Sequence, residues 1–252
     1  MSSSPSAAHS PVPPIGLRER TEIIVGATGL ARLEAASVLV VGLGGVGAYA
    51  AEALARAGVG QLTLVDGDEV APSNLNRQLL ALGSTIGRRK VEVMAERIAD
   101  IHPGCRLTLV DRFVAADEMP ALVAGGADHV LDAIDSLTSK LALLEAALRA
   151  GVPVASSMGA GGRTDPTRLQ LGDLMSSRGC PLAREVRQRL RRRGLGPGVL
   201  AVWSDEVPRP PLPPQPMSRG RPRAVNGTIS YLPALFGLTL AGALVHRLLG
   251  EG

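Results

Sequence analysis

The chain has 252 residues, a length that suits one α/β domain with an appended lobe. Its formal net charge of +4 and pI near 9.7 fit an anionic partner. Its hydrophobic content of 45% is ample for a core, whereas an aromatic content of 2% argues against a base-stacking platform for single-stranded nucleic acid. The two cysteines, Cys105 and Cys180, form no CxxC pair, which excludes a four-cysteine zinc site and predicts a reducing, cytoplasmic setting.

The N-terminal part begins with a stretch rich in Ser, Pro and Ala. Residues 1–14 predict a disordered tail, because they have neither the basic start nor the apolar centre of a secretory signal. Residues 18–36 predict an entry helix or helices, broken at Gly26 and Gly29.

The most informative stretch is 38–47, Val-Leu-Val-Val-Gly-Leu-Gly-Gly-Val-Gly. Its apolar run predicts a buried strand, and its glycines predict a phosphate-binding loop that leads into a helix over 46–57. The amide groups at the start of that helix would face an anion. In this interpretation Gly42 permits the tight turn, Gly44 and Gly45 let a phosphate approach the backbone, and Gly47 lets the helix pack close to the strand.

The segment Leu62–Val65 predicts a second strand, which ends at Asp66. An acid at that position can accept hydrogen bonds from ribose hydroxyls. The alternation that follows predicts a Rossmann-like, mostly parallel sheet with helices on both faces over 15–160, and a smaller C-terminal lobe over 161–252. Further helices are predicted over 87–101, 120–124, 137–150 and 181–193, and further strands over 107–110, 129–131, 152–155, 167–171 and 199–204.

The C-terminal lobe holds two unusual segments. Residues 208–222 contain seven prolines, which predicts an extended or mobile loop rather than a regular element. Residues 231–249 are almost wholly apolar until His246, but the run is shorter than the ~20 residues that span a bilayer. We therefore expect a buried terminal helix, or one covered at a dimer interface, and no membrane partner.

Charged residues after the second and fourth strands indicate the chemistry. Arg77 and Lys90 could converge on phosphates held by the glycine loop, where an enzyme that breaks a triphosphate needs cations. A nicotinamide enzyme has little use for that pair, because it leaves the pyrophosphate intact. Asp135 is placed to hold Mg²⁺, whereas Asp132 either helps or caps the next helix. Ser136 is the expected N-cap of that helix.

These residues carry a resemblance. The motifs are Gly42-x-Gly44-Gly45-x-Gly47, Asp66-x-Asp68, Ser73-Asn74-Leu75-Asn76-Arg77-Gln78, Lys90 and Asp132-x-x-Asp135-Ser136, which resemble the adenylation domain of the ThiF/MoeB ubiquitin-activating-enzyme-like superfamily. Within it the chain is most similar to the TcdA (CsdL) family of tRNA threonylcarbamoyladenosine dehydratases. That likeness extends over Ser156–Ala160, Thr164–Thr167, Pro181–Ala183, Ser204–Glu206 and Asn226–Ser230.

The resemblance implies a homodimer that uses ATP and Mg²⁺ to adenylate the threonyl carboxylate of a modified adenosine beside the tRNA anticodon. It also implies a site: Asp66 would hold the ribose, Asn74, Arg77 and Lys90 would contact the phosphates, Asp68 would join the nucleotide-binding residues, and Asp135 would bind the metal. Arg20, or Arg18 in its place, would act across the dimer. A sulfur-transfer protein is a further partner that the resemblance allows.

Several alternatives stay open at this level. One is an activating enzyme for a ubiquitin-like sulfur carrier protein, although such relatives usually carry two CxxC pairs. Another is a nicotinamide-dinucleotide-binding oxidoreductase or a nucleotide sensor. Cys180 is interpreted as either a core residue or a catalytic thiol. The arginines of 181–193, with Arg209, Arg219, Arg221 and Arg223, form either an RNA-backbone contact or a solvated surface.

Overall fold

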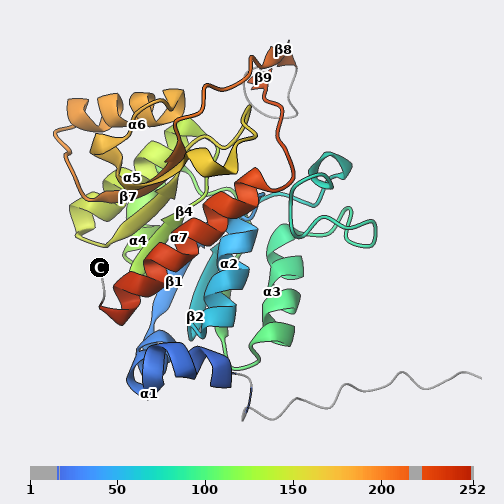
Figure 1. The fold of residues 1–252 in the computed structure, drawn as a ribbon, viewed down its shortest axis with the longest axis vertical. Coiled ribbons are helices and arrows are strands. Elements are labelled where there is room, and N and C mark those ends of the chain that lie inside the picture. Colours follow the sequence, from blue (N-terminus) through green and yellow to red (C-terminus); the bar gives the residue numbers. More distant parts are fainter. Residues whose placement is uncertain (1–15, 17, 216–222, 251–252) are drawn as a thin grey trace, which may run out of the picture.

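A computed structural model describes Gly16 and residues 18–215 and 223–250, and a seven-stranded sheet forms its centre (Figure 1). The strand order is β3-β2-β1-β4-β5-β7-β6, and β6 alone runs antiparallel to its neighbour. The predicted tail over 1–14 lies outside the described residues, and the predicted mostly parallel α/β sheet is confirmed. The strands are β1 (Ser37–Val41), β2 (Gln61–Val65), β3 (Arg106–Val110), β4 (His129–Asp132), β5 (Val154–Ser157), β6 (Leu169–Asp173) and β7 (Val199–Ser204).

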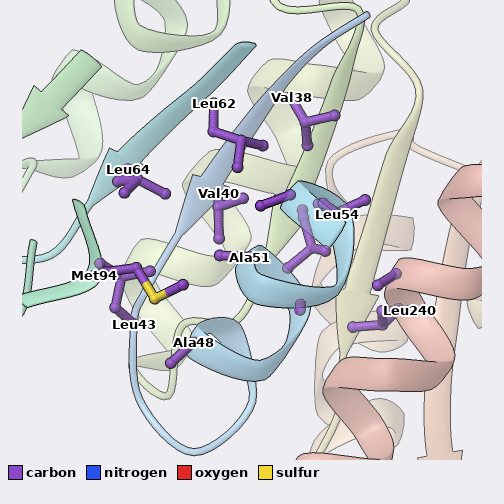
Figure 2. Close-up of a cluster of buried hydrophobic side chains, with 14 of the residues drawn as sticks. Val38, Val40, Leu43, Ala48, Ala51, Leu54, Leu62, Leu64, Met94 and Leu240 are labelled. Atoms are coloured by element: carbon purple, nitrogen blue, oxygen red, sulfur yellow. The ribbon is translucent and has the colours of Figure 1, made fainter. Parts of the chain in front are cut away.

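Two hydrophobic cores cover the two faces of this sheet. Along β1, Val38 and Val40 belong to one core and Leu39 and Val41 to the other, as the alternation of side chains in a strand requires. Figure 2 shows the first core, where β1 and β2 side chains meet α2 and Leu240 of α7. The first face is covered by α2 (Gly47–Ala57), α3 (Lys90–Ile101) and α7 (Leu232–Leu249), and the second by α4 (Met119–Val123), α5 (Leu137–Ala150) and α6 (Pro181–Arg192).

The register of the central strands brings three loops together. Val41 of β1 pairs with Val65 of β2 on one side and with Asp132 of β4 on the other. The residues that follow these strands therefore meet at the carboxyl edge of the sheet. Helix α1 (Glu19–Ala35) lies at the opposite edge, beside the start of β1 and the end of α2 (Figure 1).

Several element boundaries differ from the sequence expectations. Helix α1 kinks at Gly26, where φ is +69°, but it continues through Gly29, which packs closely against Leu249. Helix α3 begins at Lys90 rather than at residue 87, because Arg89 forms a β-bridge with Glu69. Strand β5 begins two residues later than predicted. Short 3-10 turns occupy η1 (Pro72–Asn74), η2 (Ala116–Glu118), η3 (Pro166–Arg168) and η4 (Leu174–Ser176), and η3 delays the start of β6.

The proline-rich segment is not wholly irregular, which corrects the sequence expectation. Part of it forms β8 (Leu212–Gln215), which pairs antiparallel with β9 (Arg223–Val225). Pairing is broken between Leu212 and Gln215, where two prolines lack the N–H groups that a ladder needs. Prolines are thus accommodated because the ribbon has only two strands and an interrupted register.

Helix α7 is long and apolar enough to cross a membrane by length and composition. In this structure it instead packs along α2 and contacts α1, β5 and β7. Leu232, Phe236, Leu240 and Leu244 are fully buried on the side that faces α2. The terminal apolar segment therefore serves as a core helix, as predicted.

Candidate active site

The loop between β1 and α2 is built from glycines with little room for a side chain. Gly42 has a φ of +94°, and a Cβ atom on it would lie 2.8 Å from the Ala133 carbonyl oxygen. A Cβ on Gly47 would lie 1.8 Å from the Gly42 carbonyl oxygen. Gly44 differs, because only the Gln78 amide nitrogen, at 3.8 Å, comes near its Cβ position. The loop is therefore closed against the protein at two glycines and open to a ligand at the third.

Asp66, at the carboxyl end of β2, is hydrogen-bonded to the glycine loop. Its carboxylate accepts hydrogen bonds from the Leu43 N–H at 2.7 Å and the Asp68 N–H at 2.8 Å. Burial raises the pKa of this carboxyl, and the Lys90 ammonium and the two amide donors oppose that rise. The acid thus lies, partly buried, where dinucleotide-binding folds hold a ribose hydroxyl.

Arg77 and Gln78 lie against the same loop. The Cβ position of Gly45 is 3.5 Å from Arg77 Cγ and 3.1 Å from Pro233 Cβ, so protein covers this glycine. The Arg77 guanidinium donates a hydrogen bond to the Ser73 carbonyl at 2.9 Å. Gln78 Oε1 is buried, and no described residue donates a hydrogen bond to it. A buried acceptor beside the open Gly44 is a candidate ligand contact.

Two asparagines shape the segment that carries Arg77. Asn74 is buried, and its Oδ1 accepts a hydrogen bond from the Ala71 N–H at 3.1 Å. Asn76 accepts a hydrogen bond from the Arg77 guanidinium and donates one to the Thr228 carbonyl, both at 2.9 Å. Asn74 therefore stabilises its own turn, and Asn76 ties Arg77 to the loop before α7.

Lys90 is the first residue of α3, and its side chain is 5% exposed. Its ammonium lies 3.0 Å from Asp68 Oδ2, and its N–H donates to the Asp68 carbonyl at 3.1 Å. An ammonium has three donors, so the bond to Asp68 leaves others for phosphate oxygens. Asp68 thus orients Lys90 toward the carboxyl edge of the sheet.

The loop after β4 carries two acids in different surroundings. Asp132 is fully buried, with Oδ2 at 2.5 Å from Lys140 Nζ and Oδ1 accepting a hydrogen bond from the Ile134 N–H at 3.0 Å. These bonds leave Asp132 poorly available to a metal, whereas Asp135 is exposed. Ser136 occupies the N-cap position of α5, but its side chain makes no capping hydrogen bond.

The two N-terminal arginines lie at the far end of the molecule from this loop. The Arg18 guanidinium contacts Glu34 and His102. Its side chain also packs against Gly58, which ends α2, a helix whose 11 residues span about 16 Å. Arg20 is exposed on α1 and joins none of the ion pairs among the described residues. Neither arginine reaches the glycine loop of its own chain.

The two cysteines have structural surroundings. Cys180 is 4% exposed and packs in the second core at the start of α6. Burial raises the pKa of the Cys105 thiol to about 11. Within the described part of the chain, no group of three His, Cys, Asp or Glu residues could hold a metal ion.

The fold brings to one edge of the sheet the predicted glycines, both strand-end acids, Arg77 and Lys90, whose roles stay predictions. Sequence analysis assigned no role to Gln78, although this residue lies in the same motif. Pro233 carried no sequence signal, because it reaches the site only through the packing of α7 on α2.

The fold and the site together define an α/β nucleotide-binding protein whose phosphate loop lies where the strand order reverses. The chain belongs to the ThiF family, whose model matches residues 18–252.

Individual relatives agree with this assignment. The chain is 39% identical to the tRNA threonylcarbamoyladenosine dehydratase of Bacillus subtilis, over 92% of this chain and 94% of that protein. The crystal structure of the Escherichia coli enzyme of that name in complex with ATP matches with a TM-score of 0.83 and 38% identity, over 92% and 93% of the two chains. The Escherichia coli molybdopterin-synthase adenylyltransferase is 41% identical over only 49% of each chain.

Proposed function

We propose that this protein is an ATP-dependent tRNA threonylcarbamoyladenosine dehydratase. One observation carries the proposal: Arg77 packs against a glycine loop with an open Gly44, and Lys90 pairs with Asp68 at the same edge of the sheet, in a chain similar to such dehydratases along 92% of its length. The sulfur-carrier alternative has less support, since the molybdopterin-synthase adenylyltransferase aligns with only half of this chain. The nicotinamide alternative leaves both cations without a role.

The reaction removes one water from the modified adenosine. The threonyl carboxylate attacks the α-phosphorus of ATP, and pyrophosphate leaves with the electrons of the broken P–O bond. The carbamoyl oxygen then attacks the activated carbonyl carbon, the carbamoyl nitrogen loses its proton, and AMP leaves. Adenylation is needed because a carboxylate oxygen is a poor leaving group, and the substrate itself supplies the nucleophile.

The residues of this chain bind and orient the nucleotide. The Asp66 carboxylate accepts a hydrogen bond from a ribose hydroxyl, and Gln78 Oε1 offers a second hydrogen-bond acceptor beside Gly44. Arg77 and Lys90 stabilise the charge that develops on the phosphates as pyrophosphate leaves. Asn74 and Asp68 act indirectly, by holding the turn before Arg77 and the ammonium of Lys90.

Asp135 fits a magnesium site that is completed by the nucleotide. Mg²⁺ is usually bound by one or two carboxylates together with phosphate oxygens, and one exposed carboxylate at this edge meets that need. Asp132 is bonded to Lys140 instead. When bound, the metal would neutralise phosphate charge.

A homodimer is part of the proposal. Arg20 is exposed on α1, and this helix lies at the edge of the sheet opposite the site (Figure 1), so Arg20 could act only on a neighbouring copy. Ile23 and Ile24, on the same helix, are 80% and 83% exposed, which gives a partner apolar surface to cover. Arg18 is held by Glu34 and His102, which makes Arg20 the better candidate. A cytoplasmic setting and a sulfur-transfer partner remain proposals of the same kind.

The decisive experiment supplies ATP, Mg²⁺ and tRNA that carries threonylcarbamoyladenosine, and then weighs the digested nucleosides. A loss of one water mass, with one AMP formed per product, is expected. AMP formation only with an added carrier protein would favour the sulfur-carrier alternative. NADH binding without ATP turnover would favour the oxidoreductase.

A further inference from the structure

We infer that one face of α6 binds the phosphate backbone of the tRNA substrate. We call it the α6 arginine face, and it consists of Arg184, Arg187 and Arg191 of α6 together with Arg178 of the segment that precedes the helix. This inference rests on the proposed function, because it names where that substrate is held outside the nucleotide site.

Four arginines of α6 and its C-cap separate into two sets, and Arg192, the last residue of the helix, belongs to neither. Its buried residues, Ala183, Val186 and Leu190, face the second core. With about 100° between successive residues, Arg184 and Arg191 lie on one flank and Arg189 and Arg193 on the other. The second set is neutralised: Arg189 pairs with Glu185 at 2.6 Å, and Arg193 pairs with Glu145 of α5 at 2.5 Å.

The first set carries positive charge that no acid balances. In the part of the chain that the structure describes, Arg178, Arg184 and Arg191 join no ion pair. Arg178 and Arg184 are exposed, and so is Arg191, which lies about two helical turns after Arg184.

The surroundings of Arg187 show that the positive charges of the α6 arginine face lie close together. Its guanidinium is anchored on Ser177 by two hydrogen bonds, to the carbonyl and to the hydroxyl. Burial lowers the pKa of Arg187, and the like charges of Arg191 and Arg184 lower it further. A bound anion would relieve this repulsion, so the cluster is preorganised for a polyanion.

The α6 arginine face begins at the edge of the sheet that holds the nucleotide site. The Cβ position of Gly159, just after β5, lies 3.7 Å from Leu182 Cβ and 3.8 Å from Cys180 Sγ. Strand β5 is the neighbour of β4, whose end carries Asp132, with Ser156 as its register partner. A nucleic acid that enters the site across the end of β5 would therefore meet the start of α6, with Arg178 just before it and Arg184 in its first turn, and then follow the helix.

The chemistry of the face favours phosphates over bases. Arginines bind phosphate oxygens in bidentate pairs, and such contacts position an RNA without reading its sequence. None of the residues of α6 is aromatic, so the face offers no stacking surface. The occupant that fits is the sugar-phosphate backbone of the tRNA.

The test compares two double variants of the full-length protein. Arg184→Gln/Arg191→Gln removes two charges from the α6 arginine face, and Arg189→Gln/Arg193→Gln removes two neutralised charges from the other flank of the same helix. Binding of tRNA is measured by filter retention over a series of salt concentrations, alongside ATP binding, the melting temperature, and the kcat and KM for tRNA.

We expect Arg184→Gln/Arg191→Gln to weaken tRNA binding roughly tenfold at low salt and to reduce the slope of log Kd against log salt by about two. Its KM for tRNA should rise while kcat, ATP binding and melting temperature stay as in the unmodified protein. The matched control should bind tRNA normally.

Equal losses in both variants, or none in the first, would overturn the α6 arginine face and leave the enzyme activity standing. Normal tRNA binding without dehydration would instead overturn the proposed function and leave the surface. Failure of the unmodified protein to bind any tRNA would overturn both.

Discussion

Lys140 and Asp132 form an ion pair in which neither side chain is exposed to solvent, with Nζ 2.5 Å from Oδ2. The ammonium also donates to the Ser157 carbonyl at 2.9 Å, and Asp132 holds the Ile134 N–H. The pair therefore fixes the carboxyl ends of β4 and β5 to the loop that carries Asp135. That loop in turn contacts the glycine turn at Gly42.

Breaking this pair should be costly. Lys140→Met leaves a buried carboxylate without its counter-charge, and we expect a loss of about 3–5 kcal/mol in the free energy of unfolding, measured by chemical denaturation. The double variant Asp132→Asn/Lys140→Met removes both charges and keeps an acceptor for the Ile134 N–H. It should recover much of that loss, and a double variant no more stable than the single one would contradict the explanation.

The glycine loop predicts opposite outcomes at two positions. Gly47→Ala places a methyl group 1.8 Å from a carbonyl oxygen, so we expect a loss of about 3 kcal/mol or more in stability. Gly44→Ala meets open space, so the melting temperature should hold while ATP affinity falls at least about tenfold, or about 1.4 kcal/mol. Calorimetric titration with ATP and thermal melts separate the two effects, and a Gly44→Ala protein with normal ATP affinity would refute the open position.

Arg77 and Asp135 should matter for chemistry and little for folding. Arg77→Ala is expected to lower AMP release roughly 100- to 1,000-fold, because in the proposed mechanism it removes a donor to the charge that develops on the phosphates. Asp135→Ala should do the same and should not be rescued by excess Mg²⁺. Arg106→Ala, an exposed arginine on the edge strand β3, serves as the control. Normal AMP release in either site variant would remove that residue from the site.

If Arg20 acts on the site of the neighbouring copy, two inactive variants should complement each other in a mixed dimer. Arg20→Ala and Asp135→Ala proteins should each be inactive, yet a mixed dimer of the two contains one site with both residues intact. Mixing the proteins under conditions that exchange subunits should therefore restore part of the dehydration rate. Arg18→Ala should instead lower the melting temperature, since it removes contacts with Glu34 and His102. No recovery in the mixture, with mixed dimers present, would exclude action across the dimer.

The buried His102 should make stability depend on pH. Burial, and then the Arg18 charge, lowers the pKa of this imidazole below its ordinary value of 6.5. The imidazole therefore binds a proton more tightly in the unfolded chain than in the folded one. Its contribution to the free energy of unfolding is complete above pH 6.5 and is lost as the pH falls through the pKa of His102 in the folded protein. Melting temperatures from pH 8 to pH 5 should fall less for His102→Gln than for the unmodified protein. An equally steep fall in both proteins would contradict this explanation.

The sequence predicted what local pattern and chain order determine. Apolar runs located the central strands, and the parallel alternation placed Gly42, Asp66 and Asp135 at one edge. Strand ends were less predictable, because Pro166 begins a short turn that moves the start of β6.

Long-range contacts were not predictable in this way. Nothing local distinguishes Lys140 from a surface lysine on an amphipathic helix, and only the tertiary structure shows that it is the counter-ion of Asp132. The same holds for Arg184 and Arg189, which look alike in sequence but differ because only one has a glutamate within reach.

The packing of Pro233 on Gly45 has a consequence for biosynthesis. The loop between β1 and α2 gains this cover only from α7, which lies almost 200 residues later in the sequence. A nascent chain still attached to the ribosome, with α7 inside the exit tunnel, thus lacks a finished nucleotide pocket. We therefore expect the nucleotide pocket to be completed only after α7 has left the tunnel and packed on α2.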